Sequence, residues 1–169
     1  SLLIAELDGS GERVLVSYKE PERIYPRRVA WSPDGKSFAF THNAPQKILT
    51  TIASEGGPAQ PVAGARWKDI QDLTWLPGSR YLLVAGTPRQ ASGYITTTQL
   101  YAVSLERGEA RQITHGLSEY TGVRVSADGR TLLALQDQTL ATIQVAAPGK
   151  ESEARPLSAG NETRDGQDG

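Results

Sequence analysis

A hairpin segment with the sequence WSPDGK, which begins at Trp31, constrains the fold of this chain more than any other feature. Pro33 presets the φ angle required at the second position of a type I turn, and Asp34 tolerates the third position. Gly35 accepts the positive φ that closes a tight antiparallel hairpin. We therefore predict a hairpin whose core lies near Trp31 and Phe40.

The same device recurs twice further along the chain. The second copy turns at Pro77 and Gly78, and the third turns at Asp128 and Gly129. Their opening positions, 31, 75 and 125, are 44 and 50 residues apart. A period of about 40 to 50 residues in a chain of short strands is typical of β-propeller blades. The sequence therefore predicts an all-β fold, a partial β-propeller of four-stranded antiparallel blades, with about three and a half blades in this chain.

The predicted blades divide residues 1–169 as one partial propeller domain. Its parts are a half blade (1–17), three blades (28–63, 72–114 and 121–158) and a polar connector (159–169). The segment 18–27 contains two prolines and five charged residues, which is typical of a connector between strands. An open arc of this kind leaves apolar faces at its ends, so we also expect self-association through the terminal blades.

Composition excludes several function classes. The formal net charge of −1 provides no field that would recruit nucleic acid. The chain has no cysteine, which removes disulfides, thiolate metal sites and cysteine nucleophiles. No apolar run approaches the roughly 18 residues of a membrane-spanning helix, so we expect no direct membrane insertion in this segment. Any partner must be recognised by local features of the surface.

The sequence predicts no catalytic residues, no metal site and no cofactor. It lacks the G-x-S-x-G, H-E-x-x-H and G-x-x-x-x-G-K-[ST] motifs and the protein-kinase loops. Its two histidines, His42 and His115, are 73 positions apart. The glycine-rich segments 8–11 and 55–58 join predicted strands and open no helix, so we interpret them as turns and not as phosphate-binding loops. The carboxylates of 162–168 lack the frame of a calcium loop.

These residues carry a family resemblance. The segment 31–40 (WSPDGKSFAF) resembles the WD-like repeat of TolB-type β-propellers, and 111–114 (RQIT) is similar to the short strand that closes their blades. More narrowly, 99–145 resembles the C-terminal propellers of bacterial eukaryotic-like Ser/Thr protein kinases and related transcriptional regulators. The second copy has Leu-Pro-Gly in place of Ser-Pro-Asp-Gly, and the third lacks Trp and Pro. The resemblance implies a periplasmic or extracytoplasmic location, with a cytoplasmic one left open.

In the propellers that this chain resembles, the connectors between blades and the loop after each second strand emerge on one common face around the central channel. Aromatic and basic side chains of the kind that recognition surfaces use are found in those segments here. The candidate ligand-binding residues are Tyr25, Arg66, Trp67, Lys68, Tyr94, His115 and Tyr120, with Arg27 beside them. The alternative is that Trp67 and Tyr120 pack beneath the neighbouring blade.

The resulting functional hypothesis is a non-catalytic recognition or sensor module. It would belong to a TolB-like or kinase-linked bacterial protein and bind a protein, a peptide or a ligand of the cell envelope. The alternative is the gating propeller of a prolyl-oligopeptidase-type serine hydrolase, whose catalytic domain lies elsewhere in the protein. A nucleophile elbow in the longer protein would favour the hydrolase, and a transmembrane helix upstream would favour the receptor.

Overall fold

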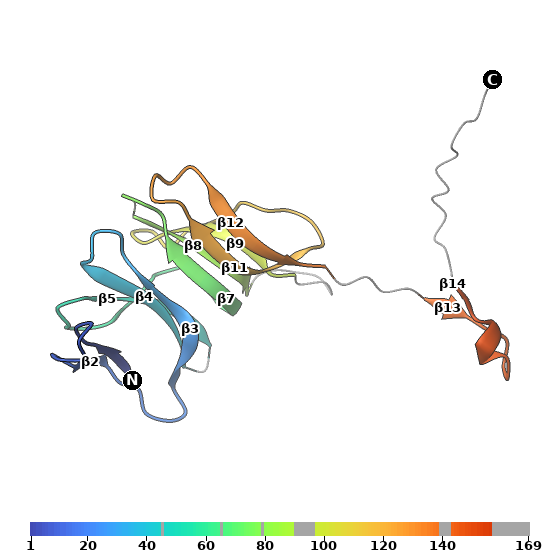
Figure 1. Cartoon of the computed structure of the whole chain (residues 1–169), viewed down its shortest axis with the longest axis horizontal. Helices are drawn as coiled ribbons and strands as arrows, with labels where there is room; N and C mark the ends of the chain where they lie inside the picture. The colour runs from blue at the N-terminus through green and yellow to red at the C-terminus, as the bar shows by residue number, and fades with distance from the viewer. Residues whose placement is uncertain (45, 65, 79, 90–96, 139–142, 157–169) are drawn as a thin grey trace, which may run out of the picture. The chain divides into compact units, whose positions relative to one another are not determined.

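The computed structural model describes residues 1–44, 46–64, 66–78, 80–89, 97–138 and 143–156 (Figure 1). The chain divides into two compact units, Ser1–Gln138 and Thr139–Gly169. Nearly all of the described regular structure is antiparallel strand, and the single helical element among the described residues is the short 3₁₀ helix η1 (Glu151–Glu153). The prediction of an all-β fold is therefore confirmed.

Two four-stranded arrays form the centre of the first unit. The first contains β3 (Arg23–Trp31), β4 (Ser37–Asn43), β5 (Lys47–Ala53) and β6 (Gln60–Pro61). The second contains β7 (Trp67–Trp75), β8 (Tyr81–Pro88), β9 (Gln99–Ser104) and β10 (Ala110–Gln112). Each strand pairs antiparallel with the next in sequence, and a bridge between Lys47 and Trp67 joins the two arrays. The strands β3 and β7 hold the inner position of their arrays and lie in contact with each other.

Two hairpins lie at the ends of this unit. The strands β1 (Leu2–Ile4) and β2 (Arg13–Val16) pair with each other, as do β11 (Glu119–Val125) and β12 (Leu132–Asp137). The second unit contains η1 and the pair β13 (Gln144–Val145) and β14 (Arg155–Pro156). The predicted blade 121–158 therefore spans both units, and its completeness stays a prediction. The predicted connector 159–169 lies outside the described residues.

The hairpin turns show how local chemistry positions the strands. Gly35, Gly78 and Gly129 have φ angles of 73°, 60° and 72°, values that disfavour residues with a Cβ. The Asp34 carboxylate accepts hydrogen bonds from the Ser32 hydroxyl at 2.7 Å and the Lys36 amide at 3.0 Å. Asp128 accepts the equivalent bonds in the third copy. Each aspartate thus stabilises its turn by accepting hydrogen bonds from nearby donors, and this keeps the two flanking strands in register.

The hydrophobic core lies between the arrays and the hairpins, because successive strand residues face opposite neighbours. The cluster between the two arrays includes Ala39, Leu49, Trp75 and Leu82. A second cluster joins Leu15 of β2 to Phe38, Phe40 and Ile52 of the first array. A third joins Leu83, Ala85 and Leu100 of the second array to Val123 of β11.

The prediction that Trp31 lies in the core of its hairpin is wrong, whereas Phe40 is fully buried as expected. The Trp31 side chain is exposed, and its Nε1 donates to the carbonyl oxygen of Gly35 in its own turn at 3.0 Å. The equivalent residue, Trp75, is buried, and its Nε1 donates to the carbonyl of Ala30 on the preceding inner strand at 3.0 Å. Trp75 therefore packs against the preceding blade, whereas Trp31 contacts its own turn, and the burial of the tryptophan depends on what covers the inner strand.

Candidate functional site

Two adjoining pockets lie at the end of the arrays opposite the 31–36 turn. A pocket of about 350 Å³ is lined by Asn43, Gln46, Lys47, Trp67, Lys68 and Arg89. A pocket of about 340 Å³ is lined by Ala44, Gln46, Lys47, Ile48, Val62, Gly64 and Arg66. Because they share Gln46 and Lys47, we treat them as one site and call it the connector site. Its defining cations are Lys47, Arg66, Lys68 and Arg89.

Three separate segments build the connector site. The turn between β4 and β5 is closed by a hydrogen bond from the Ala44 amide to the carbonyl of Gln46 at 3.0 Å. The Arg89 amide at the end of β8 donates to the carbonyl of Arg66 at 2.9 Å, which ties the second array to the connector. Both hydrogen bonds join backbone groups, so they position these segments without using the basic side chains.

The segment 62–64, which follows β6 in the connector between the two arrays, lies close to the turn between β9 and β10. Gly108 lies directly against Ala63 and Gly64, and a Cβ at Gly108 would overlap the carbonyl oxygen of Ala63. Gly108 also has a φ of 68°, in the region that favours glycine. The path of 62–64 therefore depends on a glycine in the turn between β9 and β10.

The environment of Lys47 is rich in cations. Its Nζ pairs with the Asp69 carboxylate, and Arg28 Nη1 lies 3.8 Å from the same carboxylate. The Tyr25 ring lies 4.9 Å from Lys47 Nζ and 4.8 Å from the Arg28 guanidinium carbon, distances typical of cation–π contacts. Burial, followed by the charge of Arg28, lowers the pKa of Lys47. The Asp69 carboxylate thus lies beside two cations, Lys47 and Arg28, next to the connector site.

Two of the aromatic candidates, Trp67 and Tyr120, are buried or half-buried. Trp67 is buried, meets the Tyr101 ring edge-on with centroids 5.3 Å apart, and has an Nε1 without a hydrogen-bond partner. Tyr120 is half-buried against the cluster around Leu83 and Val123. Both residues therefore pack in blade interfaces, although Trp67 also forms one wall of the connector site.

The structure brings together Arg66, Trp67 and Lys68 from the predicted set. Tyr25 lies beside them beneath the cations near Asp69, while His115 is exposed on the connector 113–118 and lines neither pocket. Tyr94 and the side chain of Arg27 lie outside the described residues. The sequence reading missed four polar lining residues, Asn43, Gln46, Lys47 and Arg89. They lie in or beside loops that follow second strands, which is the signal that could have identified them.

The described residues offer little for catalysis. His42 is buried, its ring stacks on Tyr18 at 4.2 Å between centroids, and its Nδ1 has no hydrogen-bond partner. Burial lowers the pKa of His42, which favours the neutral ring. A general base of the triad type has an acid hydrogen-bonded to its imidazole, and no such hydrogen bond is made by the Nδ1 of His42 within the described ranges. Over the described ranges, no group of three His, Asp or Glu side chains is placed to hold a metal ion.

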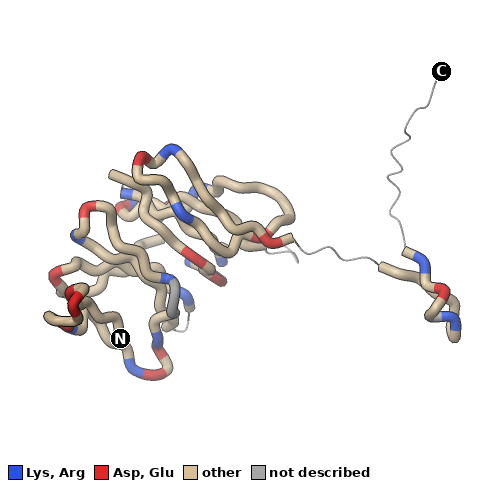
Figure 2. Tube along the Cα trace, viewed as in Figure 1, with Lys and Arg blue, Asp and Glu red and all other residues tan. Residues whose placement is uncertain are grey.

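Charge is distributed rather than segregated over most of the surface. Figure 2 shows basic and acidic residues interspersed along the described part of the first unit. The connector site departs locally from this pattern, because no carboxylate lines either of its pockets. Among the described segments, none forms a helix of the length and apolarity that crossing a bilayer requires.

Comparison with known proteins identifies the fold. No protein-family model and no curated protein matches the chain. The crystal structure of TolB from Acinetobacter baumannii is similar with a TM-score of 0.61 and 19% identity, covering 78% of this chain and 31% of that one. A protein described as a TolB from Agrobacterium tumefaciens is similar with a TM-score of 0.58 and 14% identity, covering 79% of this chain and 45% of that one.

The strand order and these similarities define a β-propeller segment of the TolB-like type. The predicted resemblance is therefore confirmed at the level of the fold. The chain spans less than half the length of either solved structure. At this level of identity the likeness carries the fold alone, because one fold hosts many functions.

Proposed function

We propose that this chain is a non-catalytic recognition module that binds an acidic segment of a protein or peptide at the connector site. The observation that carries this proposal is the pocket in which three cations, Lys47, Lys68 and Arg89, converge with no carboxylate in its lining. Lining amides from Asn43 and Gln46 add donors and acceptors that suit a peptide backbone.

The chemistry of the site suits an anionic partner. Complementary charge steers encounter and suppresses partners of the wrong sign, and arginine is enriched among residues that dominate binding energy. Arg66, Lys68 and Arg89 line the pockets together with Lys47, which also pairs with Asp69. Exposed cations of this kind give binding that weakens as salt is added.

The wider context is proposed on the strength of the fold. We place the module in a TolB-like or kinase-linked bacterial protein, in the periplasm or another extracytoplasmic compartment, where it senses a protein or a component of the cell envelope. We also propose that it self-associates through its terminal blades.

Fluorescence anisotropy with a labelled Asp/Glu-rich peptide tests the connector site. We expect saturable binding that weakens with salt, and a loss of affinity of roughly tenfold or more in the double variant K68E/R89E. The matched control is R130E, because Arg130 is also exposed but lies in the turn at the other end of the strands.

Two results would overturn the proposal. The first is the absence of saturable binding to the acidic peptide at low salt. The second is an equal loss per charge in R130E and in K68E/R89E, which would show that only overall charge matters.

A further inference from the structure

Lys47 is the cation that lines both pockets of the connector site. Its Nζ pairs with the Asp69 carboxylate, and Asp69 itself lines neither pocket. The Lys47 and Asp69 side chains are 18% and 28% exposed, so solvent screens their attraction only in part. The cation shared by the two pockets is therefore already bound to an anion of the chain itself.

A second cation lies close to the same carboxylate. Arg28 Nη1 is 3.8 Å from Asp69 Oδ1, which is too far for a hydrogen bond. This Nη1 is buried and has no hydrogen-bond partner within the described part of the chain. Burial also lowers the pKa of Arg28, because its charged form is poorly solvated. A buried donor without a partner is costly, so a movement of Asp69 toward Arg28 would be favourable at that nitrogen.

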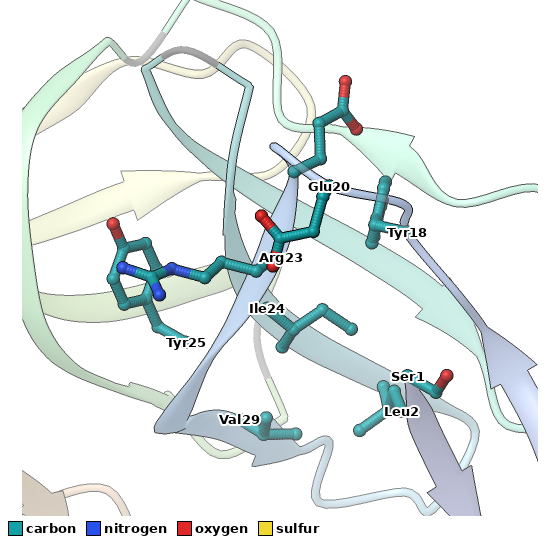
Figure 3. Close-up of a pocket in the computed structure, with 9 residues that line it drawn as sticks. Ser1, Leu2, Tyr18, Glu20, Arg23, Ile24, Tyr25 and Val29 are labelled. Carbon is teal, nitrogen blue, oxygen red and sulfur yellow. The ribbon is translucent and has the colours of Figure 1, made fainter.

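Contacts outside the two pockets hold Arg28 and Asp69 beside each other. Gln71 Nε2 donates to Asp69 Oδ2, and Gln71 Oε1 accepts a hydrogen bond of 3.5 Å from Arg28 Nη2. The Tyr25 ring lies beneath the Arg28 guanidinium. Figure 3 shows the Arg23 side chain beside the same ring, with its guanidinium carbon 5.8 Å from the ring centroid. The position of this pair of side chains therefore does not depend on what occupies the connector site.

We propose that Asp69 is an internal competitor of the ligand for Lys47. A carboxylate of the acidic peptide displaces Asp69 from Lys47 Nζ, and the released carboxylate moves by about 1 Å onto Arg28 Nη1, to the usual length of a charge-assisted hydrogen bond. The exchange leaves both cations paired and gives the buried Nη1 an acceptor. This inference rests on the proposed function of the connector site and adds the residue that sets its affinity.

Competition and a purely structural role predict opposite changes in affinity. If Asp69 only held Lys47 in position for the ligand, loss of its charge should weaken binding. If Asp69 competes, the same change leaves Lys47 open and removes a like charge beside the incoming carboxylate, so binding tightens. Arg28 lines neither pocket, yet its loss should weaken binding, because the displaced Asp69 would have no second partner.

Fluorescence anisotropy with the labelled Asp/Glu-rich peptide tests the exchange on the chain 1–169. We expect D69N to bind the peptide roughly threefold or more tightly than the wild-type chain, and K47Q to bind it more weakly. In the K47Q background, D69N should change the affinity by less than about twofold, because the contested cation is gone. Circular dichroism and the melting temperature establish that each variant is folded before it is titrated.

The matched control for D69N is E12Q, which should leave the affinity unchanged. Glu12 is exposed, and the neighbouring Arg13 donates to the carbonyl of Ser54, at the end of the first array that holds the 31–36 turn.

R28Q tests the other partner of Asp69 and keeps the exchange testable if D69N does not fold. We expect R28Q to bind the peptide roughly threefold more weakly than the wild-type chain. The control of equal charge is R130Q, which should bind as the wild-type chain does, because Arg130 lies in a turn at the other end of the strands.

Several outcomes would overturn the competition. They are unchanged or weaker binding by folded D69N, an equal gain from D69N in the wild-type and K47Q backgrounds, and unchanged binding by R28Q. If K68E/R89E loses binding while D69N gains none, the connector site remains a peptide site without an internal competitor. If the peptide binds D69N but not the wild-type chain, the proposed function fails and the competition stands. Binding by neither chain overturns both.

Discussion

Two blade interfaces inside the first unit, on either side of β7, use opposite hydrogen-bond chemistry at two positions of that strand, Trp75 and Asp72. Between β3 and β7, the donor is the Trp75 indole and the acceptor is a backbone carbonyl, that of Ala30. Between β7 and β11, the acceptor is the Asp72 carboxylate and a donor is a backbone amide, that of Val123, at 3.0 Å. One interface is closed by a side-chain donor, and the next by a side-chain acceptor.

The difference explains why the third repeat tolerates a valine where the others have tryptophan. Asp72 accepts from the amides of Leu73 and Val123 and from Arg124 Nη1, so it holds β11 from the β7 side. Val125, at the tryptophan position of β11, needs no indole donor for this purpose. Each pair of adjacent blades is therefore joined by a hydrogen bond between inner strands, and its side-chain group comes from the later strand in one interface and from the earlier strand in the other.

The largest expected effect comes from removing the acceptor of the second interface. Asp72→Leu leaves the buried amide of Val123 without a partner and should lower the free energy of unfolding by about 2 to 4 kcal/mol. Urea unfolding at fixed protein concentration measures this loss. Arg124→Gln is the control, because the Arg124 side chain is 65% exposed and its ion pair should contribute less than about 1 kcal/mol. Equal losses in the two variants would assign the interface to the ion pair instead of the amide.

Sequence reasoning succeeded where local chemistry decides the structure. The turn at 31–36 is set by a proline, an aspartate and a glycine that act within a few residues, and the turn at 126–131 by an aspartate and a glycine. It failed for Trp31, because the exposure of a side chain depends on which neighbour covers it. The position of a hairpin turn is set by residues within the turn, whereas the burial of its tryptophan depends on what the preceding blade covers.

The candidate site divides in the same way. Arg66 and Lys68 could be selected because a connector with adjacent cations and an aromatic residue is visible in one stretch of sequence. Lys47 and Arg89 come from loops of different blades, and their approach to the connector depends on contacts such as the one between Arg89 and Arg66. Asp72, at the second blade interface, carries no local signal of that role, since its partners on β11 are about 50 residues away.

A smaller effect should come from the indole of the first interface. Trp75→Phe keeps an aromatic ring and removes the hydrogen bond to Ala30, so we expect a loss of about 1 to 2 kcal/mol in unfolding free energy. Trp31→Phe is the matched variant in the same repeat position. Its indole bonds to an exposed turn, so this substitution should cost less than about 0.5 kcal/mol. Equal costs at the two positions would show that the interblade hydrogen bond adds nothing to the ring contacts.

The smallest expected effect extends the comparison to the interface between β1–β2 and the first array, where His42 is enclosed. Its pKa is lowered below the ordinary 6.5, chiefly by burial, so the unfolded chain takes up a proton at His42 more readily than the folded chain. Stability that depends on neutral His42 is therefore present above pH 6.5 and is lost as pH falls below that value.

Thermal unfolding followed from pH 7.5 to 5.5 measures this dependence. His42→Phe keeps the stacking on Tyr18 and should flatten the decline in melting temperature over that range. His115→Phe is the control and should leave the decline in place, because His115 is exposed on its connector. If His115→Phe removes the decline and His42→Phe does not, the pH response lies in the connector between the second array and β11. The β1–β2 interface would then contribute no pH-dependent stability over this range.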